Sequence, residues 1–167
     1  AVYDKKNKEI NLIRDRYGEK PLYLLKLKNQ IFAFSSDIIA FSDIKEFSLS
    51  LDLQGLACFF QRGYIAAPLS IWKDVKKIMP GTKTTISLGK DRKYYLLKEE
   101  KYWSIKDNAI YGQKNLYQGT YEEAKKDLEN LFVEILKGQS LSDVPLGVFL
   151  SGGIDSSLIA ALLKKIS

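Results

Sequence analysis

A glycine-rich loop that follows an apolar run constrains this chain more than any other feature. Residues 146–150 (Leu-Gly-Val-Phe-Leu) are apolar throughout, as expected for a strand that is buried on both faces of a sheet. The loop, residues 151–157 (Ser-Gly-Gly-Ile-Asp-Ser-Ser), comes next, and residues 156–164 have the composition of an apolar helix. With a further helix upstream, the order helix, buried strand, loop, helix predicts the beginning of a doubly wound parallel α/β sheet.

The upstream helix has recognisable ends. Residues 120–123 (Thr-Tyr-Glu-Glu) form a capping box, in which the Thr120 hydroxyl accepts from the backbone N–H of Glu123 and the Glu123 side chain reaches back. Gly138 stands where a C-terminal cap is expected. Between these ends, apolar residues recur along one helical face: Ala124, Leu128, Leu131, Phe132, Ile135 and Leu136.

The loop has the residue types that bind phosphate. Ligands of open α/β sheets bind at the carboxyl ends of the strands, where this loop is predicted to lie. Gly152 and Gly153 allow the backbone to approach an anion closely and to adopt positive φ. The N-terminus of the following helix adds N–H groups and positive potential, and the hydroxyls of Ser151, Ser156 and Ser157 are further donors.

The loop lacks the lysine of the Walker A motif G-x-x-x-x-G-K-S/T, which reaches the β- and γ-phosphates. Many neutral donors with one carboxylate favour a magnesium-bearing pyrophosphate that leaves intact, and Asp155 would position the Mg²⁺ directly or through water. Cleavage between the α- and β-phosphates would then activate an acceptor carboxylate as an acyl-adenylate. The alternative is that Asp155 only caps the helix.

The first 97 residues predict an antiparallel meander. Strands are predicted over residues 10–14, 22–27, 31–34, 82–87 and 92–97, and helices over residues 36–41 and 53–62. Residues 98–118 are polar and aperiodic and are predicted to form a linker. The predicted organisation is therefore a first domain over residues 1–97, this linker, and a second domain over residues 119–167.

The composition is that of a globular protein, with 167 residues, 46% hydrophobic content and a formal net charge of +6. The lysines are dispersed, which favours a solvated surface over nucleic-acid binding. No apolar run is long enough to span a membrane. The single cysteine, Cys58, cannot form an internal disulfide, which predicts a cytoplasmic protein, and the lack of histidine excludes a Ser-His-Asp relay.

Several motifs together resemble one family. Residues 151–157 match the pyrophosphate loop of the ATP-pyrophosphatase families, and residues 141–150 closely resemble the same region of glutamine-hydrolysing asparagine synthetases. Upstream segments resemble the glutaminase domain and linker of that family: residues 14–23, 64–72, 76–81 and 102–103. The resemblance covers essentially the whole chain, in order.

The resemblance implies that residues 1–97 are the C-terminal part of an N-terminal-nucleophile glutaminase domain and that residues 119–167 open a synthetase domain. In this family, a first-residue cysteine hydrolyses glutamine and the ammonia passes through a tunnel. The synthetase domain converts aspartate and ATP through β-aspartyl-AMP into asparagine, AMP and pyrophosphate. The chain is thus expected to belong to a carbon–nitrogen ligase that uses ATP, Mg²⁺, glutamine and aspartate, with a homodimer left open.

Only the ATP-loop positions are carried over from the family. The resemblance implies that Leu150 lines the nucleotide and that Asp155 lies near the Mg²⁺. The pyrophosphate is expected to be surrounded by Ser151, Gly152, Gly153, Ser156 and Ser157. No catalytic residue is assigned, because the nucleophilic cysteine is expected upstream of Ala1, and Cys58 lies in an apolar run typical of core. We expect the chain to be a fragment that is inactive by itself.

Two alternatives share the same loop. A related amidotransferase could act on another carboxylate, such as that of a sugar acid or a peptide. A truncated, non-catalytic nucleotide-binding remnant would bind MgATP without turnover. Residues 14–16 (Arg-Asp-Arg) are predicted to hold a hairpin together and to have no role in chemistry.

Overall fold

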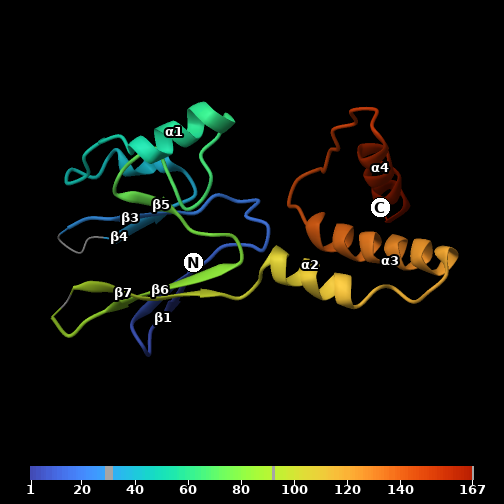
Figure 1. Ribbon diagram of the computed structural model, residues 1–167, viewed down its shortest axis with the longest axis horizontal. Helices are drawn as coiled ribbons and strands as arrows, with labels where there is room; N and C mark the ends of the chain where they lie inside the picture. Colours follow the sequence, from blue (N-terminus) through green and yellow to red (C-terminus); the bar gives the residue numbers. More distant parts are fainter. Residues whose placement is uncertain (29–31, 92, 167) are drawn as a thin grey trace. The chain divides into compact units, whose positions relative to one another are not determined.

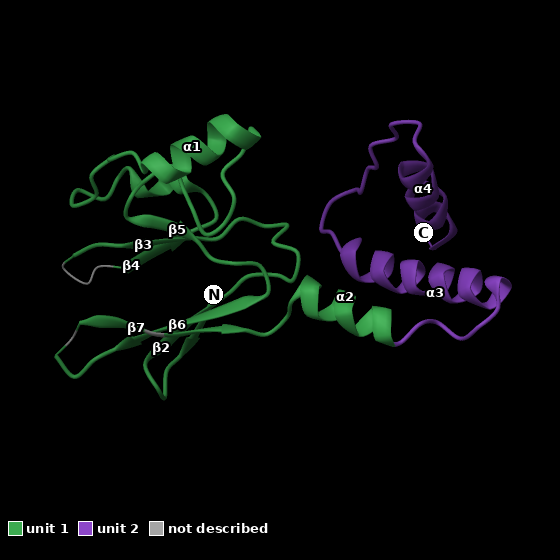
Figure 2. Ribbon diagram, viewed as in Figure 1, with its two compact units in different colours: residues 1–114 green, residues 115–167 purple. Residues whose placement is uncertain are grey.

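Two antiparallel sheets form the framework of residues 1–114, which are one of two compact units and are called unit 1 (Figure 2). The structure is a computed structural model that describes residues 1–28, 32–91 and 93–166. Within these residues the sheets have the strand orders β1-β2-β6-β7 and β4-β3-β5. The strands are Val2–Asp4 (β1), Glu9–Ile13 (β2), Tyr23–Lys26 (β3), Phe32–Ser35 (β4), Val75–Lys77 (β5), Thr82–Leu88 (β6) and Tyr94–Lys101 (β7).

The two sheets form two layers of unit 1 (Figure 1) and share an apolar core. Leu12 and Ile86 from the four-stranded sheet pack with Leu24 from β3. Successive side chains of a strand point to opposite faces, so the neighbouring Leu25 belongs to a second cluster, with Phe41 among its members. The three-stranded sheet is therefore buried on both faces.

Two short helical elements accompany the three-stranded sheet on the side away from the other sheet (Figure 1). They are the 3₁₀ helix η1 (Ile38–Phe41) and the helix α1 (Leu53–Arg62). The predicted helix over residues 53–62 is confirmed, and each predicted strand is present within the described residues. The predicted meander is wrong, because β2 pairs with β1 and β6 whereas β3 pairs with β4 and β5, in a different sheet. Ile31 and Arg92, which the sequence places in strands, lie outside the described residues.

One hydroxyl in the core between the sheets leads to a stability prediction. Thr84 is opposite Leu12 and is 0% exposed, and its Oγ1 has no hydrogen-bond partner among the residues that the structure describes. A buried hydroxyl without a partner costs free energy, and valine has nearly the same shape. We expect Thr84→Val to raise the free energy of unfolding by about 1 kcal/mol, as measured by urea denaturation.

The adjacent threonine is the matched control. Thr85 is also buried, but its Oγ1 donates to Asn11 Oδ1 over 2.9 Å. We expect Thr85→Val to lower the free energy of unfolding by about 1 kcal/mol, because Asn11 loses its partner. A Thr84→Val protein that is less stable than the parent would contradict this account of the core.

Residues 98–118, which are predicted to form a linker, contain regular structure. β7 continues to Lys101, because residues 98–101 pair with the first half of β6. Helix α2 follows over Ile105–Lys114, and Ser104 stabilises its first turn by accepting from the backbone N–H of Asp107. The charged residues 98–101 give no strand pattern of their own, because they form a strand only by pairing with β6. The proposed domain boundaries themselves stay predictions.

Residues 115–167 form unit 2, which contains the helices α3 (Tyr121–Gln139) and α4 (Ile154–Ile166). The predicted capping box is present in full at Thr120 and Glu123. The predicted C-terminal cap at Gly138 is wrong, because α3 continues past it and the Ser140 N–H donates to the Leu136 carbonyl over 2.9 Å. Helices α3 and α4 contact each other, and Lys165 Nζ lies 2.6 Å from Glu129 Oε1.

The predicted buried strand over residues 146–150 is not formed. Within the described part of unit 2 the structure has no strand, and Phe149 is 98% exposed. A strand needs neighbours that satisfy its backbone N–H and C=O groups, and residues 115–166 supply none. The structure shows mixed α/β architecture with antiparallel sheets, and the described residues contain no doubly wound sheet. Among the described helices, none has the length and apolar character needed to cross a membrane.

Candidate functional site

The loop over residues 151–157 leads into the N-terminus of α4. Gly152 has a φ of +83°, a left-handed conformation that glycine adopts without the steric penalty of a Cβ. The Ser157 N–H donates to the Gly153 carbonyl over 3.1 Å. Helix N–H groups before this point have no partner within the helix, so they are directed toward any anion that binds there.

Three hydroxyl and backbone contacts hold the loop together. Ser151 Oγ lies 3.0 Å from Ser156 Oγ, and Ser156 Oγ donates to the Gly153 carbonyl over 3.1 Å. The Gly153 N–H is 3.5 Å from Ser151 Oγ. The structure therefore brings Ser151, Gly153 and Ser156 together.

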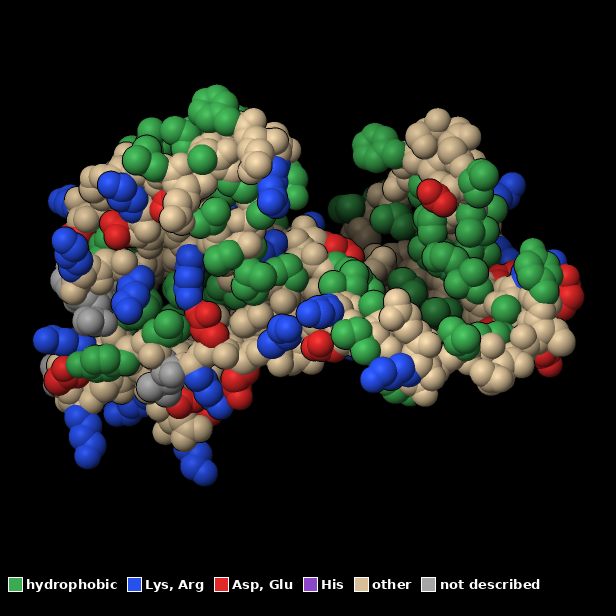
Figure 3. Space-filling view, in the orientation of Figure 1, with side chains coloured by type: hydrophobic (Ala, Val, Ile, Leu, Met, Phe, Trp, Pro, Cys, Tyr) green, Lys and Arg blue, Asp and Glu red, His purple; other side chains and the backbone are tan. Residues whose placement is uncertain are grey.

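The remaining predicted positions lie around this cluster. Leu150 precedes it and is exposed, and Ser157 is exposed in the first turn of α4. Asp155 is also exposed in that turn, which is where a carboxylate interacts favourably with the helix dipole. Figure 3 shows hydrophobic side chains gathered over α4, close along the chain to this loop.

The residues present fit a magnesium ion only if phosphate oxygens supply further ligands. Within the described residues, no group of three or more His, Cys, Asp or Glu side chains could hold a metal ion. Mg²⁺ at a nucleotide is commonly bound through one or two carboxylates together with phosphate oxygens and water. Asp155 supplies one such carboxylate, so the loop is compatible with Mg²⁺ that arrives with ATP.

In unit 1, Arg14 is a structural anchor. Its Nη1, Nη2 and Nε donate to the carbonyls of Ile78, Gly18 and Lys20 over 2.6, 2.9 and 3.1 Å. These bonds join the turn after β2 to the segment after β5. Arg14 therefore holds the connection between β2 and β3 in place, but the predicted hairpin is not formed, because these two strands belong to different sheets.

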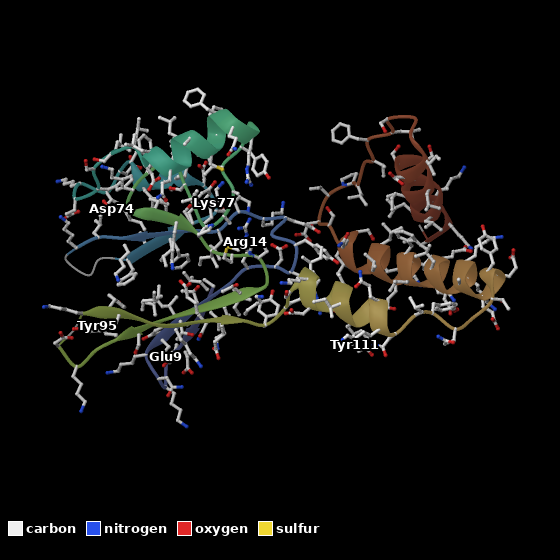
Figure 4. The ribbon with its side chains drawn as sticks, viewed as in Figure 1. Glu9, Arg14, Asp74, Lys77, Tyr95 and Tyr111 are labelled. Carbon is white, nitrogen blue, oxygen red and sulfur yellow. The ribbon has the colours of Figure 1, made fainter. Side chains whose placement is uncertain are left out.

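Two further charges in this region have shifted pKa values. Lys77 donates to the Ile65 carbonyl, and burial lowers its pKa, as does the positive charge of Arg14 (Figure 4). Burial would raise the pKa of Asp15, but backbone N–H groups, including those of Glu19 and Lys20, donate to its carboxylate and hold the pKa below its ordinary value. Asp15 thus also stabilises the turn.

The aromatic pair Tyr102-Trp103 attaches the end of β7 to this same turn. Tyr102 Oη donates to the Arg14 carbonyl over 2.6 Å. The backbone N–H groups of both residues donate to the Gly81 carbonyl, over 2.8 and 3.2 Å. The rings of Trp103 and Tyr17 have centroids 4.9 Å apart. The sequence alone associates the pair only with the family's linker. Two adjacent aromatic residues in a polar stretch nevertheless indicate packing against another part of the protein.

Comparison with known proteins defines the class of the chain. The family model of the glutamine amidotransferase domain matches residues 1–103, and the chain belongs to this family. The family model of asparagine synthase matches residues 127–167. The first match covers the two sheets of unit 1 and the Tyr102-Trp103 pair, and the second covers most of α3, the loop and α4.

Individual relatives are similar to the chain across both matches. Asparagine synthetase (glutamine-hydrolyzing) 3 of Bacillus subtilis is 31% identical over 97% of this chain and 24% of its own length. Asparagine synthetase (glutamine-hydrolyzing) 1 of the same organism is 28% identical over 98% of this chain and 24% of its own length. The human asparagine synthetase (glutamine-hydrolyzing) is 28% identical over 99% of this chain and 27% of its own length. The chain therefore spans less than a third of the length of these relatives.

Proposed function

We propose that this chain forms the junction between the glutaminase and synthetase domains of a glutamine-dependent asparagine synthetase. The observation that carries the proposal is the succession of two family matches in one chain, with the loop of residues 151–157 inside the second. The corresponding domains are residues 1–97, of the N-terminal-nucleophile class, and residues 119–167, with residues 98–118 between them. The enzyme is a cytoplasmic carbon–nitrogen ligase.

In the proposed reaction, ammonia released from glutamine is transferred to aspartate. The aspartate side-chain carboxylate attacks the α-phosphorus of ATP and forms β-aspartyl-AMP, while pyrophosphate leaves. Ammonia then attacks the acyl carbon and releases asparagine and AMP. The loop would stabilise the leaving pyrophosphate, because negative charge develops there in the transition state.

Each loop residue has a proposed part in this step. Gly152 allows the backbone to lie close to the pyrophosphate. Gly153 connects this backbone to the N-terminus of α4, whose first N–H groups face the anion. Hydroxyls of Ser151, Ser156 and Ser157 donate to phosphate oxygens, so the Ser151–Ser156 contact would be exchanged for ligand contacts. Leu150 packs on the nucleotide, and Asp155 orients the Mg²⁺. When bound, Mg²⁺ neutralises phosphate charge.

The apolar segment before the loop has a proposed role in the same site. Residues 146–150 would become a strand of a doubly wound parallel sheet when neighbouring strands pair with it. Their apolar side chains, which are largely exposed in the described structure, would then be buried. This pairing would fix the position of the loop at the carboxyl end of the strand.

A chimaeric enzyme tests the proposal. The chain would replace the aligned segment of the Bacillus subtilis asparagine synthetase 3, and asparagine, AMP, pyrophosphate and glutamate would be measured. We expect glutamine-dependent asparagine formation with one AMP and one pyrophosphate for each asparagine. We expect the 167-residue chain alone to form no asparagine.

Loop variants of the chimaera separate the two activities. We expect Gly152→Ala to lower asparagine formation by about 100-fold, because a Cβ at a φ of +83° displaces the phosphate-binding backbone. Glutamine hydrolysis should stay within about twofold, which also shows that the variant folds. Gly138→Ala is the control, because a Cβ there meets no atom within 4 Å and should leave both activities intact.

Three outcomes would contradict the proposal. Amide formation on another carboxylic acid, without asparagine, would favour a related amidotransferase. Glutamine hydrolysis with MgATP binding but no amide product would favour a non-catalytic nucleotide-binding role. Full asparagine formation by the Gly152→Ala chimaera would remove the loop from the site.

A further inference from the structure

A cavity lies within unit 1, among residues where β7 leads into α2. It has a volume of about 310 Å³, at the small end of the range for ligand pockets. Its lining includes Arg16, Tyr17, Met79, Lys101, Trp103 and Ile105. These residues come from three separate parts of the sequence, and no proposed step of the synthetase reaction uses them.

The walls of this cavity are apolar and partly fixed in place. The Trp103 and Tyr17 rings lie against each other with their planes inclined by 58°. Trp103 is half-buried, and its backbone N–H donates to the Gly81 carbonyl. Met79 and Ile105 add aliphatic surface. An aromatic or branched ligand body would therefore find a surface that is already formed, which limits the entropy cost of binding.

The charged residues of the cavity are both cations. Among the residues that the structure describes, Arg16 has no carboxylate within ion-pair distance. Lys101 Nζ lies 4.0 Å from Asp107 Oδ2, and both side chains are exposed, so this contact is weak. The cavity thus carries two positive charges and one nearby negative charge. A ligand with one negative charge would complement it.

We propose that this cavity binds a small amphipathic anion, with an aromatic or branched aliphatic body and one carboxylate. The body packs against Trp103 and Tyr17. The carboxylate accepts two parallel hydrogen bonds from the planar guanidinium of Arg16, and Lys101 adds a second positive charge. This inference concerns unit 1 alone and does not depend on the proposed reaction.

The test uses the complete 167-residue chain labelled with ¹⁵N, and two probes of nearly equal shape. Phenylacetate carries the negative charge, and phenylacetamide is its neutral counterpart. The indole N–H signal of Trp103 reports binding at the cavity, and that of Trp72 reports on the core of unit 1. We expect a saturable shift of the Trp103 signal, with phenylacetate binding about fivefold more tightly than phenylacetamide at low ionic strength.

Two substitutions identify the source of this preference. Arg16→Gln should abolish the difference between the probes and leave phenylacetamide binding within about twofold. Arg62→Gln, at an exposed arginine of α1 that is not among the cavity residues named above, should leave both affinities unchanged. The proposal is overturned by any of three results: no saturable Trp103 shift up to about 20 mM probe, equal binding of the two probes, or a preference that persists in Arg16→Gln.

Discussion

Replacement of Gly81 by alanine is expected to lower the free energy of unfolding of unit 1 by about 3 kcal/mol. Gly81 has a φ of +63°, and an added Cβ would lie 2.5 Å from the Trp103 carbonyl oxygen. The left-handed backbone costs about 1–2 kcal/mol for alanine. The overlap must also displace residues 102–103, whose N–H groups both donate to the Gly81 carbonyl.

Gly63 provides the matched control for this substitution. It has a φ of +75° at the end of α1, but a Cβ there meets no atom within 4 Å. Gly63→Ala should therefore cost only about 1–2 kcal/mol, the penalty of the backbone conformation alone. Urea denaturation of both variants would measure the difference. Equal destabilisation by the two substitutions would show that the close approach to Trp103 has no energetic effect.

The second large effect is expected at Arg14. Arg14→Lys should lower the free energy of unfolding by about 2–3 kcal/mol, although the charge is retained. The guanidinium donates to three carbonyls from separate directions, and a lysine ammonium on its flexible stem cannot reach all of them. At least one half-buried carbonyl would be left without its partner.

Arg16→Lys is the corresponding control, because Arg16 is exposed and has no ion-pair partner among the described residues. It should change the free energy of unfolding by less than about 0.5 kcal/mol. Thermal and urea unfolding would measure both variants under the same conditions. An Arg14→Lys protein as stable as the parent would indicate that charge, and not the geometry of the three bonds, is what matters at this position.

Local sequence signals predicted the elements that depend on nearby residues. The capping box at Thr120 and Glu123 is present as expected, because both partners lie within one turn of the helix. The bounds of α1 also agree with the predicted range 53–62, since Asp52 accepts from Gly55 N–H at its start and Gly63 ends it. The loop of residues 151–157 is recognisable by its glycines and serines, and Gly152 does adopt a positive φ; its role in phosphate binding stays a prediction.

Predictions failed where an element depends on a distant partner. The charged residues 98–101 form part of β7 because they pair with β6, and their own pattern gives no strand signal. Conversely, residues 146–150 have the apolar pattern of a buried strand but lack a neighbour within the described residues of unit 2. Strand formation is a pairwise property, so composition alone decides neither case.

The sequence by itself determined the bounds of α1, the capping box of α3 and the family to which the chain is similar. Only the tertiary structure showed that the Arg14 guanidinium donates to three carbonyls. It also showed that the Gly81 carbonyl accepts from the backbone N–H groups of residues 102 and 103. It alone placed Arg16 and Lys101 at one cavity. The physical reason is that helix caps and turns are satisfied by residues a few positions apart. The Arg14–Ile78 bond, the contacts of Gly81 and the cavity instead join positions far apart in the sequence, and their geometry exists only after the sheets have packed.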